Sequence, residues 1–298
     1  VFTRRLRIVK YRGSTHQTNE FPFLINTSGI SILPITSVSL KHTASSERLS
    51  TGVPKLDEML EGKGYYRGSS ILVSGTAGTG KSSLCATMAD SCCKRGEKVL
   101  YMSFEESQHQ IIRNMKSIGQ KKKKWVDQGL LTFYSERTTS MGIEAHLVSI
   151  HNLIREKKPE LVIIDPITSF ISQHNVLETN ALLTRLIDFI KARNMTGFFT
   201  NLTKHGRDLE TSETDISSII DTWILLRDIE SNGERNRGIY ILKSRGIANS
   251  NQIREFIITS KGIDLRDVYI GSGGVLTGSS RIIQEMEDAK GIDSIGNE

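Results

Sequence analysis

One eight-residue segment constrains the fold more than any other feature of the sequence. Residues 75–82 read Gly-Thr-Ala-Gly-Thr-Gly-Lys-Ser, which fits the spacing G-x-x-x-x-G-K-[ST], and they stand between an apolar run and a helical pattern. Glycines in such a turn let backbone amides point at a bound phosphate, and the helix N-terminus adds the positive end of its dipole. We therefore predict that this segment holds the phosphates of ATP, with Lys81 on the β- and γ-phosphates and Ser82 on Mg²⁺.

Apolar strand-like runs alternate with helical patterns along the rest of the chain. Strands are predicted over residues 70–74, 99–103, 161–165, 197–203, 222–226 and 239–243, and helices over 81–95, 107–118, 142–157 and 178–194. Continuous apolar strands joined through helices form a mostly parallel sheet buried on both faces, and the last strands, with no helices between them, form an antiparallel extension. The predicted fold is therefore α/β, with a mostly parallel central sheet flanked by helices, as in P-loop nucleoside triphosphatases of the RecA type.

Composition decides little beyond the broad class. The chain is 37% hydrophobic and 24% charged, as is typical of a soluble globular protein. No apolar run approaches the ~18 residues that cross a bilayer, and there is no signal-peptide pattern, so we predict a cytoplasmic location and no membrane partner. The cysteines Cys85, Cys92 and Cys93 match no zinc spacing and are interpreted as reduced thiols. Part of the net charge of +6 is a lysine run at 121–124, interpreted as a solvated face.

Three carboxylates stand where the sheet would meet the phosphate site. Asp165 ends an apolar strand, where it would face Mg²⁺ through water. Glu105 and Glu106 follow the strand 99–103, a position from which a carboxylate can orient and deprotonate the attacking group. The pair could instead be the negatively charged first turn of a helix. We favour catalysis, with Lys81, Glu105 and Glu106 as catalytic residues and Ser82, Glu105 and Asp165 on the metal side.

A pair of cations lies on a later strand. Lys243 and Arg245 are two residues apart, so they point the same way, and burying both without an anion would be costly. They need an exposed edge or a phosphate. The same pair recurs as Lys10 and Arg12, and we therefore favour a phosphate: in a ring of subunits the pair reaches the γ-phosphate held by the neighbour, as arginine fingers do. A solvated edge strand is the alternative.

The two cation pairs belong to a longer repeat. Lys10-Tyr11-Arg12-Gly13, Phe23 and Gly29 match Lys243-Ser244-Arg245-Gly246, Phe256 and Gly262 at one gapless offset of 233 residues. Duplication explains a shared offset better than chance does. Residues 1–33 are therefore predicted to be the C-terminal strands of a truncated upstream RecA-like domain. Residues 34–50 form a linker rich in Ser and Thr, 51–268 a second RecA-like domain, and 269–298 a C-terminal tail.

These motifs together resemble the KaiC family, tandem-domain ATPases and autokinases of bacterial clock systems. The resemblance covers essentially the whole chain and rests on the segment Ser50 to Met59, the P-loop, Phe104-Glu105-Glu106-Ser107, Ile216-Ser217-Ser218-Ile219 and Lys243-Ser244-Arg245-Gly246. It implies ATPase and serine autokinase activity for residues 51–268, in a circadian-type, timing or stress-regulatory system. It also implies a homo-hexamer, alone or stacked into a dodecamer, with ATP and Mg²⁺ between protomers, and a KaiB-like regulatory partner on the upstream domain.

The resemblance places site residues on both sides of each protomer boundary. One subunit would offer Glu105, Glu106, Asp165 and the P-loop residues Gly78, Thr79, Gly80, Lys81, Ser82 and Ser83. Its neighbour would offer Arg237, Lys243, Ser244 and Arg245. The ATP of the upstream domain would meet Lys10, Arg12 and His16. The adjacent phosphoacceptors fall on Ser217 and Ser218, and Ser212 falls where the family has a threonine linked to phosphate exchange.

The chain departs from the family's pattern at three positions, which leaves open the balance of kinase, phosphatase and ATPase activity. Ser218 replaces a threonine, Ile118 stands where a tryptophan stacks on adenine, and Ser172 stands where an arginine is often found. Two other functions stay open. A RecA- or RadA-like DNA-dependent ATPase or helicase would suit the positive charge, but the loops 173–178 and 205–214 do not combine aromatic residues with lysines, so nucleic acid is disfavoured. A non-catalytic nucleotide-binding scaffold would not need the intact lysine and carboxylates.

Overall fold

The computed structural model describes residues 4–16, 18, 20–26, 29–32, 44–120, 123–171, 176–203, 218–231, 233–271 and 274–284. Within these residues one large sheet forms the centre of the molecule. Its strands are β6 (Ser70–Gly75), β7 (Val99–Ser103), β8 (Leu131–Ser135), β9 (Leu161–Asp165), β10 (Thr196–Leu202), β11 (Thr222–Ser231), β12 (Glu234–Ser244), β13 (Arg254–Thr259) and β14 (Gly262–Asp267).

The order of these strands is β14-β13-β12-β11-β6-β10-β9-β7-β8. The six strands from β11 to β8 run parallel, and β12, β13 and β14 add to β11 as an antiparallel extension. This confirms the predicted fold. Because the carboxyl ends of parallel strands share one edge of a sheet, the loops after β6, β7 and β9 meet there.

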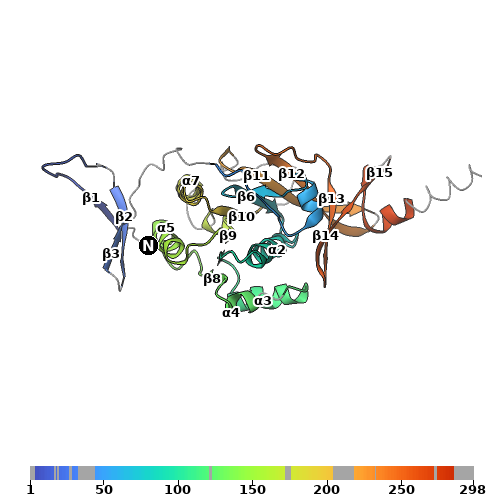
Figure 1. The fold of residues 1–298 in the computed structure, drawn as a ribbon, viewed down its shortest axis with the longest axis horizontal. Helices are drawn as coiled ribbons and strands as arrows, with labels where there is room; N and C mark the ends of the chain where they lie inside the picture. The colour runs from blue at the N-terminus through green and yellow to red at the C-terminus, as the bar shows by residue number, and fades with distance from the viewer. Residues whose placement is uncertain are drawn as a thin grey trace, which may run out of the picture.

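Helices cover both faces of the sheet (Figure 1). They are α1 (Pro54–Glu58), α2 (Lys81–Lys94), α3 (Gln108–Ser117), α4 (Lys123–Asp127), α5 (Ile143–Lys157), α6 (Thr168–Ile171) and α7 (Val176–Lys191). Alternate residues of each strand face opposite sides: Ile71 packs with the α2 side of the core, and Leu72 packs with the α5 and α7 side. No helix among the described residues is both long enough and apolar enough to cross a membrane.

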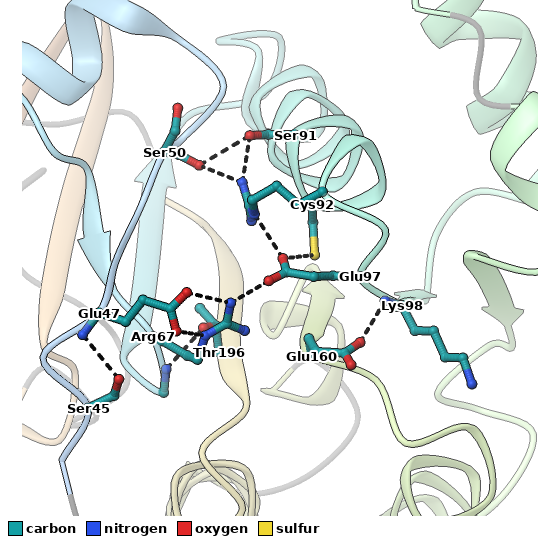
Figure 2. Close-up of polar contacts among 12 residues, drawn as sticks. Ser45, Glu47, Ser50, Arg67, Ser91, Cys92, Glu97, Lys98, Glu160 and Thr196 are labelled. Atoms are coloured by element: carbon teal, nitrogen blue, oxygen red, sulfur yellow. Dashed lines mark hydrogen bonds and ion pairs between the residues drawn. The ribbon is translucent and has the colours of Figure 1, made fainter.

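The segment before the first central strand is tied to the domain by charged side chains. Arg67 donates to both carboxylate oxygens of Glu47 and also to Glu97, which follows α2 (Figure 2). Residue 48 begins β4 (Arg48–Leu49), which pairs with β5 (Tyr65–Tyr66). The last part of the predicted linker is therefore packed against the domain and held near the C-terminal end of the P-loop helix.

A separate three-stranded sheet stands at one end of the molecule, beyond α5 (Figure 1). It contains β1 (Arg5–Arg7), β2 (Glu20–Asn26) and β3 (Gly29–Ile32). Its pairing repeats that of β12, β13 and β14 at the offset seen in the sequence: Phe23 pairs with Ile32 as Phe256 pairs with Leu265, and β1 pairs with β2 in the same register as β12 with β13. A short hairpin of β15 (Tyr269–Gly271) and β16 (Gly274–Leu276) follows the central sheet.

A half-buried histidine makes the stability of this fold sensitive to pH. The ring of His151 on α5 lies 4.0 Å from the ring of Phe189 on α7. Burial, Arg193 and Arg155 together lower the pKa of His151 to about 4. A base whose pKa falls on folding stabilises the native state fully above its unfolded pKa of about 6.5, and this contribution is lost as the pH falls toward 4.

We therefore expect His151 to account for a loss of about 1 kcal/mol in the free energy of unfolding between about pH 7.5 and about pH 5.5. Urea unfolding at the two pH values would measure this, and His151→Gln should reduce the loss by that amount. His109→Gln, at an exposed position on α3, is the control. An equal pH dependence in the wild type and His151→Gln would contradict the prediction.

Candidate active site

The P-loop adopts its predicted form at the carboxyl end of β6. Gly78 and Gly80 have φ angles of 82° and 99°, which favour glycine. Gly80 is also closely covered, because a Cβ there would lie 2.7 Å from the Phe256 ring and 2.8 Å from Ile258. Strand β13 thus packs directly on the turn that begins α2. The glycine pattern reflects both the backbone conformation and this close packing.

Lys81 is held inside the P-loop. Its Nζ atom donates to the carbonyl oxygens of Gly75 at 2.8 Å and Thr76 at 2.7 Å, and the side chain is buried. Burial lowers the pKa of Lys81, whereas the carboxylates around it, with Asp165 foremost, favour the charged form. The ammonium group is therefore poised among carbonyl oxygens that a phosphate oxygen can replace. Thr79, also buried, donates to the Thr76 carbonyl at 2.9 Å and braces the same turn.

Asp165 ends β9 and is fixed by two hydroxyl groups. Tyr101 donates to one carboxylate oxygen at 2.7 Å, and Thr200 donates to the other. These contacts hold the carboxylate at the edge where β6, β7 and β9 end. Neither hydroxyl donor was predicted, because each lies on a different strand and no spacing in the sequence connects it to Asp165.

Glu105 and Glu106 do not belong to a helix. Helix α3 begins only at Gln108, because Ser107 is its N-cap: the Ser107 hydroxyl accepts from the Gln110 amide, and the Gln110 side chain accepts from the Ser107 amide. The alternative that the two glutamates merely form a first helical turn is therefore wrong. They stand between the strand β7 and the cap, where their side chains can face the phosphate site.

Each glutamate has its own hydrogen-bond donor. Ser169 Oγ donates to Glu105 Oε1 at 3.1 Å, and Asn114 Nδ2 donates to Glu106 Oε1 at 3.2 Å. Burial, followed by the charges of Asp165 and Glu105, raises the pKa of Glu106. A carboxylate with a raised pKa accepts a proton more readily, as a general base requires.

These groups line one cavity of about 490 Å³. The predicted residues that line it are Gly78, Gly80, Lys81, Ser82, Ser83, Glu105, Glu106 and Asp165. Asn114, Met115, Ile118 and Ile258 form an apolar and amide-lined part of the same cavity. Ile118 thus lies where the adenine ring of a nucleotide could bind, although its side chain lacks the flat ring that a tryptophan would offer for stacking. The structure brings together all the residues predicted for the nucleotide-holding side except Thr79, which supports the turn from beneath.

The predicted cation pair lies at the other end of the same sheet. Gly75 is level with Leu226 of β11 and through it with Ile239 of β12, whereas Lys243 is four residues further from the P-loop along β12. At about 3.3 Å per residue this is about 13 Å, further than a lysine side chain can span to its own P-loop. Lys243 is half-buried and Arg245 is exposed. Ser244, between them, shares a hydrogen bond of 3.0 Å with Thr222.

Ser218 accompanies these cations. The Arg245 guanidinium donates to the Ser218 carbonyl oxygen, and the Arg245 amide donates to the Asp221 carbonyl at 2.8 Å. Lys191 forms an ion pair of 2.7 Å with Asp221. Ser218 itself is exposed. The segment after Ser217 is therefore anchored at the edge of the sheet opposite its own P-loop. Ser172, Ser212 and Ser217 lie outside the described residues, as do 204–216.

Arg237 lies away from Lys243 and Arg245, the other two cations that were predicted to face a neighbour's ATP. It lies on β12 level with Asp228, and its Nε atom donates to the carbonyl of Gly78 in its own P-loop at 3.1 Å. Asp228 in turn accepts from Thr76 at 3.2 Å. Arg237 and Asp228 thus brace the outer side of the P-loop. Lys10 and Arg12 of the first repeat are exposed and His16 is half-exposed, on the connection between β1 and β2.

Fold and site together define a P-loop ATPase of the RecA type. The family described as the KaiC ATPase matches residues 49–268. Over 290 residues the chain is 51% identical to the circadian clock protein KaiC2 of Synechocystis sp., covering 97% of this chain and 51% of that protein. It is 35% identical to the circadian clock oscillator protein KaiC of Thermostichus vulcanus, over 99% of this chain and 58% of that protein. The chain belongs to the KaiC family of ATPases, and it spans about half the length of the curated relatives that it matches.

Proposed function

We propose that this chain hydrolyses ATP and transfers its γ-phosphate to Ser217 and Ser218 at boundaries between identical subunits. One observation carries the proposal. The nucleotide cavity lies at the carboxyl edge of the parallel strands, whereas Lys243, Arg245 and Ser218 lie at the opposite edge of the same sheet. Neither group can complete the other within one subunit, but a neighbouring copy can supply the missing half.

Such a site requires a head-to-tail contact, in which two different surfaces of the subunit meet. Contacts of this kind close into a ring when the rotation between copies permits. The homo-hexamer, alone or stacked in pairs, is the ring that we propose. Lys243 supports this assembly: burial and the adjacent Arg245 lower its pKa, so a phosphate anion from the neighbour would relieve an unfavourable pairing of like charges.

The positions of these residues support the following reaction. Lys81 and the P-loop amides hold the β- and γ-phosphates, and Lys243 and Arg245 of the next subunit meet the charge that develops on the transferred group. For hydrolysis the nucleophile is water, and for autophosphorylation it is a serine hydroxyl. Its oxygen bonds to the γ-phosphorus as the bond from that phosphorus to the bridging oxygen of ADP breaks. The proton passes to Glu105 or Glu106, and ADP leaves.

The residues at this site suit Mg²⁺. Among the described residues no group of three or more His, Cys, Asp or Glu side chains could form a metal cage. Mg²⁺ commonly takes one or two carboxylates together with water and substrate phosphates. Ser82, Glu105 and Asp165 offer the hard oxygen atoms for this role, and the bound ion would neutralise charge on the β- and γ-phosphates.

The repeat supports a tandem arrangement for the whole protein. Ile32 is 45% exposed, whereas its counterpart Leu265 is fully buried. Because Phe256 packs on Gly80, its counterpart Phe23 would pack on the P-loop of an upstream RecA-like domain, and Lys10, Arg12 and His16 would serve that domain's ATP. A KaiB-like regulatory partner on the upstream domain, and a role in circadian-type or other timing, complete the proposal.

Incubation with ATP and Mg²⁺, followed by mass spectrometry of phosphopeptides, tests the kinase activity. We expect phosphate on Ser217 and Ser218, and its loss in the variant Ser217→Ala/Ser218→Ala with hydrolysis retained. The variant Ser279→Ala is a matched control at an exposed serine whose amide bonds Glu234, at the opposite end of β12 from Lys243. A preparation that hydrolyses ATP but carries no phosphate on either serine would remove the autokinase from the proposal and leave the ATPase.

A further inference from the structure

A hydroxyl group outside the predicted site touches one of its carboxylates. Ser169, on α6, is 8% exposed, and its Oγ atom lies 3.1 Å from Glu105 Oε1. A serine hydroxyl in a helix commonly bonds to a backbone carbonyl one turn earlier. Here it donates to an acid on a different element. Nothing in the sequence near Ser169 connected it to Glu105.

Buried aromatic rings fix the two partners beside each other. Phe104 immediately precedes Glu105, and Phe170 immediately follows Ser169. Their ring centroids are 4.6 Å apart in an edge-to-face arrangement, and both rings also meet the ring of His146 edge-to-face. All three side chains are buried. Since this packing holds the end of β7 against α6, the contact between Ser169 and Glu105 is set by the core.

Backbone and hydroxyl contacts hold the same segment from its other side. Thr138 donates to the Ser169 carbonyl at 2.9 Å, and the Phe104 amide donates to the Asp165 carbonyl at 3.1 Å. The segment that follows β7 and carries Glu105 is thus joined to the segment that carries both Asp165 and Ser169. A displacement of α6 would move the Asp165 carboxylate and the Ser169 hydroxyl together.

We propose that Ser169 is a positioning residue for Glu105 in the transfer of the γ-phosphate, an inference that rests on the proposed function. Its hydrogen bond occupies one carboxylate oxygen and fixes the plane of the carboxyl group, so that the other oxygen faces the nucleophile and the metal side. Glu106 is held separately, by Asn114 from α3. The two glutamates therefore have independent supports, and the loss of Ser169 should disturb only Glu105.

Steady-state hydrolysis of ATP by Ser169→Ala tests this role. Removal of a residue that hydrogen-bonds a functional group of the site commonly lowers activity about 10- to 100-fold. We therefore expect kcat to fall about tenfold. KM should change less than about twofold, because Ser169 is not among the residues that line the nucleotide cavity. Ser169→Thr and Ser169→Val have the same shape and differ in the hydroxyl. The threonine variant should keep most of kcat and the valine variant should lose it, even if the alanine variant folds poorly.

A second arm separates a positioning role from a structural one. In a Glu105→Gln background, Ser169→Ala should lower the residual hydrolysis no further, because it acts through Glu105. Thr184→Ala, which removes a half-buried hydroxyl of α7 that does not line the cavity, should leave kcat unchanged. An unchanged kcat in Ser169→Ala, or an equal loss in both backgrounds, would overturn the inference while the proposed function stands. Full activity in Glu105→Gln would overturn the inference and leave Glu106 as the base in the proposed function.

Discussion

The substitution Lys81→Ala is expected to lower ATP hydrolysis by about a hundredfold to a thousandfold, because a preorganised charge at the transferred phosphate commonly contributes that much. The Nζ atom already lies among the P-loop carbonyls of Gly75 and Thr76. It therefore needs little rearrangement to reach the phosphates, whereas Arg237 of the same subunit is engaged by the Gly78 carbonyl. Release of phosphate and binding of a fluorescent ATP analogue would measure the loss.

Lys94→Ala is the matched control for this variant. Lys94 is the last residue of the same helix, its side chain is 68% exposed, and it pairs with Asp90 at 2.9 Å. We expect wild-type hydrolysis from it, because an exposed ion pair of this kind contributes at most about 1 kcal/mol to stability. A Lys81→Ala protein that folds normally and retains more than about half of the wild-type rate would show that the cavity is not the site of hydrolysis.

The substitution Arg245→Ala is expected to lower hydrolysis at least as strongly, although Arg245 lies at the edge of the sheet away from its own P-loop. An arginine that meets a transferred phosphate from a neighbouring chain is worth about 10³- to 10⁵-fold in other phosphoryl-transfer enzymes. Arg245 is exposed, and the hydrogen bond from its guanidinium group to the Ser218 carbonyl fixes its orientation. Lys243→Ala should show a smaller loss, because the lysine offers a point charge without the planar fork.

The size of the assembly must be measured alongside the rate for these variants. Gel filtration with ATP present should show the same ring for Arg245→Ala as for the wild type, with hydrolysis lost. Lys261→Ala, an exposed cation in the turn between β13 and β14, should keep both. Wild-type hydrolysis by an assembled Arg245→Ala protein would mean that this arginine does not meet a neighbour's phosphate.

Much of the fold could be predicted because its central strands are continuous apolar runs. The runs at β7 and β9 gave the observed bounds, and α3 and α5 began within a residue of the predicted positions. Strand β8 was not predicted, because it is a partly exposed edge strand. Its sequence mixes polar residues such as Thr132 with aromatic residues such as Phe133 and contains no continuous apolar run. The ends of β11 and β12 extend well past their predicted bounds, because the hairpin that they form is stabilised by its own ladder.

The site was predictable where one segment carries the chemistry and was not where distant segments meet. The P-loop could be predicted because all its residues lie within one eight-residue spacing, and Asp165 could be placed because it ends an apolar strand. Ser169 and Tyr101 could not be found from the sequence, because each lies 64 residues from its partner. Asn114 lies only eight residues from Glu106, but no spacing in the sequence marks it as a donor to that carboxylate. Arg237 was grouped with Lys243 by the resemblance, but a strand of this length carries the two residues to opposite ends of the sheet.

Hydrolysis by mixed subunits tests most directly whether the site is shared between copies. Lys81→Ala subunits keep Lys243 and Arg245 but have a defective P-loop. Lys243→Ala/Arg245→Ala subunits keep an intact P-loop but lack the two cations, so each preparation alone should be nearly inactive. After the two are mixed in equal amounts and exchanged, about one quarter of head-to-tail boundaries should combine the two intact halves, and hydrolysis should rise to about a quarter of the wild-type rate. A mixture that is no more active than the two separate preparations, under conditions where exchange is demonstrated, would contradict a site completed by the neighbouring subunit.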